Sequence, residues 1–304
     1  MNLARLLHSF PPVHGFALDG EQVLYGRLSR SRDRLLAAAR QVLPAGWFEL
    51  GPVGVLRVDR TALEAGLAAL LAQLEAVPAK ANLLLPNCWV RSFVAEVGEL
   101  PRGRVEAEEV VRWKLKKLLP CRPEEARLDF VPLPEEGRVW VLLALEKPLA
   151  VVEEVFAAKG IATGRVEPMG VALAALLPEG SEPKLLVCLD ERTFVVVLVW
   201  EGAVRLVRHK LLPGGAEASR GLVVRQLEAT LAHAREREGL AGPLAVMLAT
   251  ALEALRDAVV AWAQGQEGVV VHPLALTDHR LAELDRANPL AAWAILAAGA
   301  GVVG

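Results

Sequence analysis

Two segments of the sequence carry residue types that could bind an anion or an acidic surface. Gly214-Gly215 precedes an expected helix, where free backbone amides could bind an anion; the alternative is an ordinary loop that enters a helix. The second segment is Trp113 within a basic run, formed by Arg112, Lys114, Lys116 and Lys117. This run could meet an acidic partner or a lipid headgroup, because an aromatic side chain among charges is a frequent binding anchor, or it could be a solvated helix end.

The motifs of familiar enzymes are missing from the sequence. It holds no GxxxxGK[ST] or GxGxxG loop for phosphate, no HExxH or cysteine–histidine spacing for zinc, and no GxSxG turn for a nucleophilic serine. Cys88, Cys121 and Cys188 are far apart, which is typical of reduced, mostly buried thiols in a cytoplasm. The sequence therefore predicts no metal site and no catalytic nucleophile.

The composition is that of a globular protein. Hydrophobic residues make up 53% of the 304 residues and aromatic residues only 5%, so leucine, valine and alanine supply the core and disorder is excluded. The 34 basic and 36 acidic side chains leave a net charge of −2. This balance excludes a chain-wide attraction to nucleic acid or to anionic lipid, although a local patch remains possible.

Two apolar segments bear on targeting and membranes. Residues 1–12 hold too few apolar positions for a signal peptide, so we expect no export. Residues 290–304 carry no charge, but they are rich in alanine and glycine and fall short of the about 20 apolar residues that a membrane span needs. The sequence predicts a buried helix there, followed by a glycine-rich turn.

Alternating apolar residues and helical spacings predict the elements that position these side chains. Residues 13–28 are typical of a β-hairpin around Asp19-Gly20, and the clearest helix follows Thr61, which would form a capping box with Glu64. Other strands are expected at 47–50, 53–58, 81–85, 90–97, 126–133, 139–145, 185–189, 194–200, 204–207, 244–248 and 269–271. From residue 184 on, strands alternate with helices, which predicts an α/β sheet.

A short internal repeat suggests a duplication. Leu18-Asp19 and Leu189-Asp190 each stand at the tip of an expected buried hairpin, near the start of each half of the chain. A strand and a helix follow both copies, so two units of like topology are expected.

The order of these segments resembles the actin-like PilM proteins of type IV pilus assembly. The likeness spans nearly the whole chain through loose motifs, which are Val111–Pro120, Leu128–Val131, Val141–Lys147, Val155–Gly160, Val166–Pro168, Arg208–Gly215 and Asn288–Leu290. The resemblance implies an α/β, actin-like fold with two lobes of duplicated ribonuclease-H-like topology and an α+β insertion. The implied division is 1–86 for the first part of lobe one, 87–162 for the partner-binding insertion, 163–183 for a crossover back, and 184–304 for lobe two, with its C-terminal helix packed back on the core.

In that fold the two Leu-Asp hairpins would be phosphate loops, and the resemblance implies a candidate ATP site formed by Asp19, Gly20, Asp190, Thr193, Gly214 and Gly215. The sequence departs from the family pattern here. Asp19 is followed by Gly20 and Glu21 without a lysine, and the second loop has no glycine, so its backbone could not approach a phosphate closely. The adenosine segments, around 249–252 and 297–301, are also reduced. No ATP hydrolysis is expected, and binding of Mg-ATP stays open.

The resemblance implies an adaptor at the cytoplasmic face of the inner membrane, peripheral to it through its partners. It would bind the cytoplasmic N-terminal peptide of a PilN-like membrane protein, and possible further partners are the pilus motor ATPases and platform protein. The residues expected to bind that peptide are Val90, Arg91, Arg112, Trp113, Lys116 and Leu119. The alternatives are an ATP-binding ATPase or kinase of the actin/hexokinase-like superfamily, with Asp19 and Asp190 holding Mg²⁺, and the cytoplasmic L-type component of type II secretion.

Overall fold

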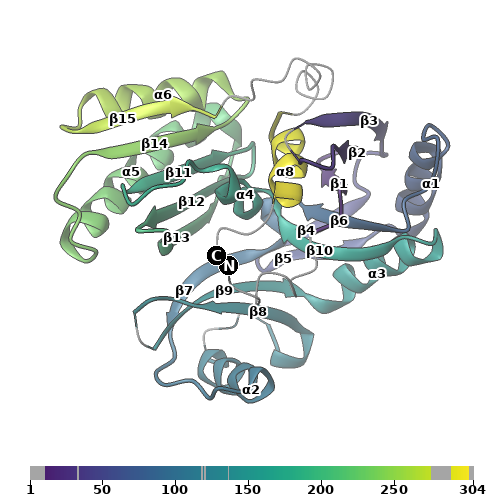
Figure 1. Ribbon diagram of the computed structural model, residues 1–304, viewed down its shortest axis with the longest axis horizontal. Coiled ribbons are helices and arrows are strands. Elements are labelled where there is room, and N and C mark those ends of the chain that lie inside the picture. The colour runs from purple at the N-terminus through teal and green to yellow at the C-terminus, as the bar shows by residue number, and fades with distance from the viewer. Residues whose placement is uncertain are drawn as a thin grey trace.

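The computed structural model describes residues 11–32, 34–117, 119, 121–135, 137–274 and 289–300. Two five-stranded sheets stand side by side, and a smaller three-stranded unit lies below them in Figure 1. The motif positions Leu118, Pro120, Asn288 and Gly301 lie outside the described residues.

The first sheet belongs to the N-terminal half of the chain. Its strands are β1 (His14–Asp19), β2 (Gln22–Leu28), β3 (Leu35–Val42), β6 (Lys80–Leu85) and β10 (Ala162–Pro168). They lie in the order β10-β6-β1-β2-β3; β1 to β3 form an antiparallel meander, and β6 and β10 run parallel to β1. Helices α1 (Arg60–Leu71) and α3 (Glu146–Ala158) pack on one face, and the hairpin of β4 (Phe48–Gly51) and β5 (Gly54–Val58) extends their core.

The second sheet repeats this plan. Its strands are β11 (Lys184–Leu189), β12 (Thr193–Trp200), β13 (Ala203–Leu211), β14 (Leu244–Ala249) and β15 (Val269–Pro273). Their order, β13-β12-β11-β14-β15, again joins an antiparallel meander to two parallel strands. Helices α5 (Gly215–Glu236) and α6 (Glu253–Gln264) cover one face. Because Asp19 ends β1, Asp190 directly follows the matching strand β11 and the two sheets share one strand plan, the predicted duplication is confirmed.

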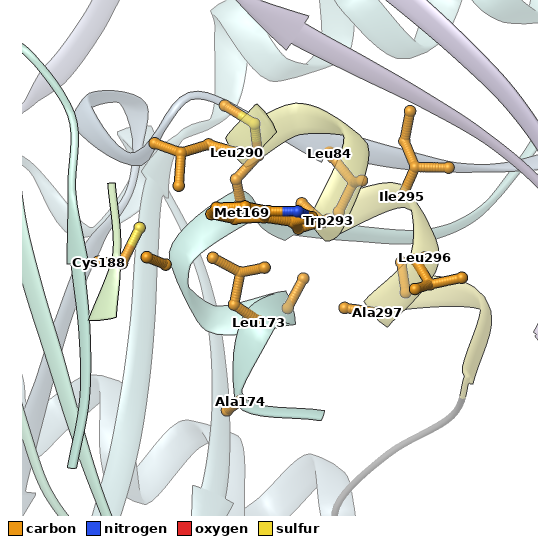
Figure 2. Close-up of a cluster of buried hydrophobic side chains, with 14 of the residues drawn as sticks. Leu84, Met169, Leu173, Ala174, Cys188, Leu290, Trp293, Ile295, Leu296 and Ala297 are labelled. Carbon is orange, nitrogen blue, oxygen red and sulfur yellow. The ribbon is translucent and has the colours of Figure 1, made fainter. Parts of the chain in front are cut away.

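A shared core joins the two sheets. It contains α4 (Met169–Ala172), the 3₁₀ turn η4 (Leu173–Leu176) and α8 (Pro289–Ala300), together with side chains from both sheets, as Figure 2 shows around Trp293. The helix α8 is apolar on all sides and buried from Leu290 to Ala298, as expected for a helix enclosed by protein. It lies so close to the first sheet that a Cβ at Gly26 would come within 2.8 Å of Ile295. Among the described residues, none of the helices has the length and hydropathy of a membrane span.

The third unit has its own small core. Strands β7 (Arg91–Glu96), β9 (Arg138–Leu145) and β8 (Ala126–Pro132) form an antiparallel sheet in the order β7-β9-β8, and α2 (Arg104–Leu115) packs on one face through Ala107, Val111 and Leu115. By contrast, α3 shares the core of the first sheet through Val152 and Phe156. We therefore propose that the insertion comprises residues 91–145, rather than the 87–162 expected from the sequence.

Two local predictions were wrong. The N-cap of α1 is Asp59, whose Oδ1 accepts the backbone N–H of Ala62 at 3.0 Å, whereas Thr61 lies inside the helix. Strand β3 was not predicted, because its sequence, LLAAARQV, has only one β-branched residue and is rich in alanine. Its pairing with β2 forms it nonetheless.

Candidate functional site

A cavity of about 290 Å³ lies between the tips of the two Leu-Asp hairpins. Asp19 and Gly20 line it from the first sheet, and Asp190 and Arg192 from the second. Gly214 and Gly215 do not line it; they form the left-handed turn that starts α5. The fold thus brings together three of the six residues of the candidate ATP site, Asp19, Gly20 and Asp190, while Thr193 is buried beneath them.

The carboxylate of Asp190 is fully engaged by its own hairpin and by the first lobe. Its Oδ1 accepts the backbone N–H groups of Arg192 at 2.8 Å and Thr193 at 2.7 Å. Its Oδ2 accepts the hydroxyl of Thr193 at 2.5 Å and the side-chain amide of Asn87 at 3.0 Å. The backbone amides that a phosphate loop would offer to its ligand are therefore bound to a carboxylate here.

Charge and size at this cavity also fit a nucleotide poorly. Among the described residues that line it, Asp19, Asp190 and Glu191 face a single cation, Arg192, whose guanidinium lies 5.7 Å from the centre of the Phe48 ring. A triphosphate would meet net negative charge from this described lining, which contains no lysine. The cavity is also at the lower limit of small-molecule sites, which begin near roughly 300 Å³. The residues present do not fit a bound Mg-ATP.

Asn87 connects three parts of the fold at this cavity. It lies in the 3₁₀ turn η2 (Asn87–Trp89) after β6, and its side chain is only 1% exposed. Its amide donates to Asp190 of the second lobe, and its Oδ1 accepts the backbone N–H of Gly170 in α4 at 2.6 Å. A Cβ at Gly170 would lie 2.9 Å from that oxygen, so the close approach needs glycine. The sequence does not predict a role for Asn87, because a single asparagine after a strand matches no known motif.

Replacing Asn87 by alanine should lower the free energy of unfolding by roughly 2 to 3 kcal/mol, because it leaves the buried N–H of Gly170 without its acceptor and removes one of the two donors to Oδ2 of Asp190. Asn87→Asp keeps an acceptor for Gly170 but places a second carboxylate beside Asp190, so it should lose more. Urea unfolding measures both. A loss below about 0.5 kcal/mol for Asn87→Ala, the range of ordinary surface changes, would show that these bonds add nothing net.

The cysteine thiols near this cavity are poor nucleophiles. Cys88 lines the cavity, but burial raises the pKa of its thiol to about 12, with a further contribution from the charge of Asp190. Burial likewise raises the pKa of Cys188. Both thiols are protonated at neutral pH and are poor nucleophiles. In the described part of the chain, no three His, Cys, Asp or Glu side chains gather in a way that could hold a metal ion.

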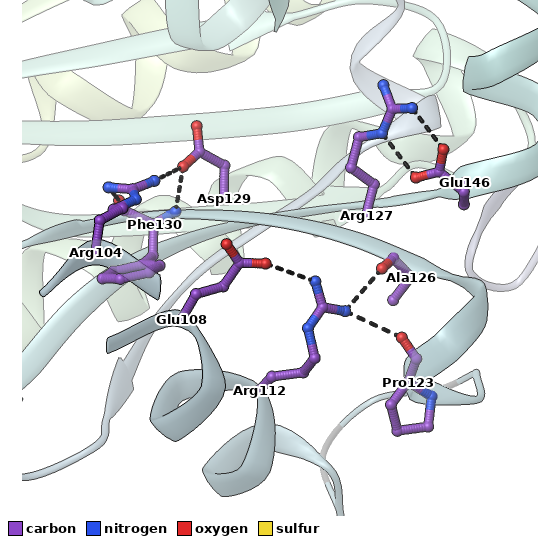
Figure 3. A network of polar contacts seen from close by, with 9 residues as sticks. All are labelled: Arg104, Glu108, Arg112, Pro123, Ala126, Arg127, Asp129, Phe130 and Glu146. Carbon is purple, nitrogen blue, oxygen red and sulfur yellow. Dashed lines mark hydrogen bonds and ion pairs between the residues drawn. The ribbon is translucent and has the colours of Figure 1, made fainter. Parts of the chain in front are cut away.

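The residues expected to bind a partner peptide do not form one surface. The guanidinium of Arg112 is occupied, because it donates to the carbonyl oxygens of Pro123 and Ala126 and pairs with Glu108 at 2.9 Å (Figure 3). Arg91 donates to the carbonyl of Pro52. Trp113 and Lys116 are exposed at the C-terminal end of α2. Leu119 packs against the insertion core, and Val90 is buried in the first lobe.

A groove that sequence reasoning missed runs between the insertion and the first lobe. It consists of two adjoining cavities of about 270 and 140 Å³, which share Asp129, Leu142, Val166 and Glu167. One wall is the lobe-facing side of β8 and β9, the other is β10 with α4 and η4, and Val199 of β12 and Val204 of β13 add to the lining from the second sheet. Most of the other lining side chains are apolar, among them Val90, Val131, Trp140, Leu149, Val171, Ala172, Ala175, Val199 and Val204. Of the six expected residues, only Val90 lines this groove.

Ion pairs join β8, in one wall of this groove, to α3, which packs on the first sheet. Arg127 of β8 binds Glu146 through Nε at 2.8 Å and Nη2 at 2.5 Å (Figure 3). Its Nη1 binds Glu153, also of α3, at 2.6 Å. The bond from Arg127 lowers the pKa of Glu146, so the pair persists at neutral pH. On β10, burial raises the pKa of Glu167, and Oε1 of that side chain has no hydrogen bond from the part of the chain that the structure describes, with Arg165 3.5 Å away. A docked donor could satisfy that oxygen.

The paired sheets, the joining helices and the cavity between two hairpin tips define an actin-like, two-lobed fold. The chain is similar to a chain of the solved PilM-PilN type IV pilus biogenesis complex, with a TM-score of 0.74 and 20% identity, covering 97% of this chain and 100% of that one. It is also similar to a Bacteroides thetaiotaomicron protein with an actin-like ATPase fold and unknown function, with a TM-score of 0.53 and 9% identity over 85% and 90% of the two chains.

The fold expected from the resemblance to PilM proteins is thus confirmed. The cytoplasmic domain of EpsL, an inner membrane component of the type II secretion system of Vibrio cholerae, gives a TM-score of 0.47 at 13% identity over 84% and 95% of the two chains, which is too low to argue from. No protein-family model and no curated protein matches the sequence.

Proposed function

We propose that this protein is a PilM-like cytoplasmic adaptor of type IV pilus assembly that binds the cytoplasmic N-terminal peptide of a PilN-like inner-membrane protein. The observation that carries the proposal is the apolar groove between the insertion and the first lobe, in a chain that matches a PilM-PilN complex chain over its full length. The protein would act at the cytoplasmic face of the inner membrane. Motor ATPases and the platform protein are further proposed partners.

The groove suits a short extended segment. Its lining is mostly apolar, with Asp129 and Glu167 as the acidic groups, and ion pairs of Arg127 join its β8 wall to α3. Strand β8 is at the edge of its sheet, but the carbonyls on its outer side are engaged, Ala126 by Arg112 and Phe130 by Arg104, so we expect the apolar lining rather than an added strand pairing to hold the peptide. We therefore place the peptide here, with Val90 retained from the expected set and Trp113 and Lys116 outside it.

In this proposal the protein acts without hydrolysing ATP. The amides of the second hairpin are held by Asp190, and that carboxylate is bound by Asn87, so neither is available to a phosphate or to Mg²⁺. These contacts weigh against an ATPase or kinase that uses Asp19 and Asp190. In this proposal the contacts around the cavity have a structural role, which is to keep the two lobes in one arrangement.

A photo-cross-linking amino acid at Val131 tests the proposed partner in cells. Val131 lines the groove and is 54% exposed, and Val270 on β15, at 53%, provides a matched control far from it. We expect the Val131 position to cross-link to the PilN-like membrane protein and the Val270 position not to. A cross-link from both positions, or from neither, would contradict the proposal.

A further inference from the structure

The C-terminal end of α2 presents an exposed patch that the groove does not use. We define the α2 patch as Trp113, Lys114, Lys116 and Lys117. Trp113 is 70% exposed, more than any other large hydrophobic side chain in the described part of the chain. The three lysines are exposed, and within the described residues none of them forms an ion pair. The ammonium of Lys114 lies 5.4 Å from the centre of the Trp113 ring.

The packing of α2 explains why these side chains point outward but not why one is a tryptophan. Ala107, Val111 and Leu115 bury the opposite face of the helix. Lysines in the last turn suit the negative end of the helix dipole, while the acidic residues of α2 lie in its first two turns. An exposed indole gains nothing from that dipole, and it leaves a large apolar surface in water.

We propose that the α2 patch docks on a membrane surface that contains anionic lipid headgroups. An indole has an apolar body and a polar N–H, and such side chains settle at the level of lipid headgroups. The unpaired lysines supply the complementary charge. Within the described residues, the patch lines none of the cavities described above, so its exposed indole and charges, rather than a cavity, must carry the contact.

This inference does not depend on the groove or on its peptide. Three lysines and one tryptophan give weak, reversible attachment, since stable anchoring needs more than a few charges. Such attachment would hold the adaptor at the membrane and raise the concentration of its groove near any membrane-tethered segment.

Co-sedimentation of the full chain with vesicles tests the proposal. The vesicles contain phosphatidylcholine alone or with about 30% phosphatidylglycerol, to give a negative surface. We expect binding only to the anionic vesicles. The variant K114Q/K116Q/K117Q should bind about a hundredfold more weakly. Each lysine near an anionic surface contributes about 1 kcal/mol, and roughly 1.4 kcal/mol corresponds to a tenfold change in affinity. Trp113→Ala should also bind more weakly.

The matched control is K80Q/K159Q/K210Q, which removes the same charge from three exposed lysines outside α2. It should bind as well as the unchanged protein. Because all the substituted lysines are exposed, each variant should keep its thermal midpoint, which a melting curve verifies. The proposal is wrong if the unchanged protein does not sediment with anionic vesicles, or if the control variant loses as much binding as the patch variant.

Discussion

Val131→Trp should reduce the affinity for the partner peptide at least tenfold, a change of about 1.4 kcal/mol or more. Val131 lines the larger cavity of the groove and stands opposite Trp140 in the β8–β9 ladder. An indole at this position would lie beside the Trp140 ring and fill space that the peptide needs. The side chain of Val131 is more than half exposed, so the fold should tolerate the change. Isothermal titration with the synthetic peptide measures the effect.

The control for this variant is Val270→Trp, at an equally exposed β-strand position in the second lobe. It should bind the peptide as the unchanged protein does, and both variants should melt at the same temperature. Equal affinity for Val131→Trp and Val270→Trp would move the peptide site away from the groove, with the α2 patch as the next surface to test.

Trp293→Ala should lower the free energy of unfolding by about 3 to 5 kcal/mol, the range for removing a large aromatic side chain from a core. Trp293 is only 8% exposed and lies in the cluster that joins α8 to α4 and to both sheets (Figure 2). A cavity at this point removes contacts from both lobes together. Urea unfolding followed by circular dichroism should therefore show one large loss of stability rather than the melting of a single lobe.

Trp293→Phe separates packing from hydrogen bonding at this position. Within the described residues, the buried indole N–H of Trp293 has no hydrogen-bond partner, so losing it should cost nothing. The phenyl ring leaves a smaller cavity than alanine does, so Trp293→Phe should cost clearly less than Trp293→Ala. A loss as large as that of Trp293→Ala would contradict the role that we assign to ring packing.

Much of the fold could be predicted because its strands are buried on both faces. Segments such as Phe194–Trp200 form apolar runs that no exposed helix would have, and the two Asp-tipped hairpins indicate the duplication. Strand β3 could not be predicted in this way, since its alanines carry little β propensity and its pairing with β2 decides its structure.

The sites were harder to predict than the fold because they depend on contacts between distant segments. The sequence predicts that Arg112 binds a partner peptide. In the structure, its guanidinium donates to the backbone carbonyls of Pro123 and Ala126, which a sequence pattern does not reveal. The groove arises where β8 and β9 face β10, and no motif in any one of these strands marks it. The departure of both Leu-Asp hairpins from the phosphate-loop pattern of PilM proteins could be predicted from the sequence, whereas the engagement of Asp190 by Asn87 could not.

Titration of the PilN-like peptide into nucleotide-free protein, repeated with saturating Mg-ATP, tests the central claim most directly. If the groove alone binds the partner and the junction between the lobes is fixed by Asn87, Asp190 and α8, the dissociation constant should be the same in both titrations. Binding that occurs only with Mg-ATP, or that changes tenfold or more on adding it, would contradict the account and indicate a nucleotide-driven switch.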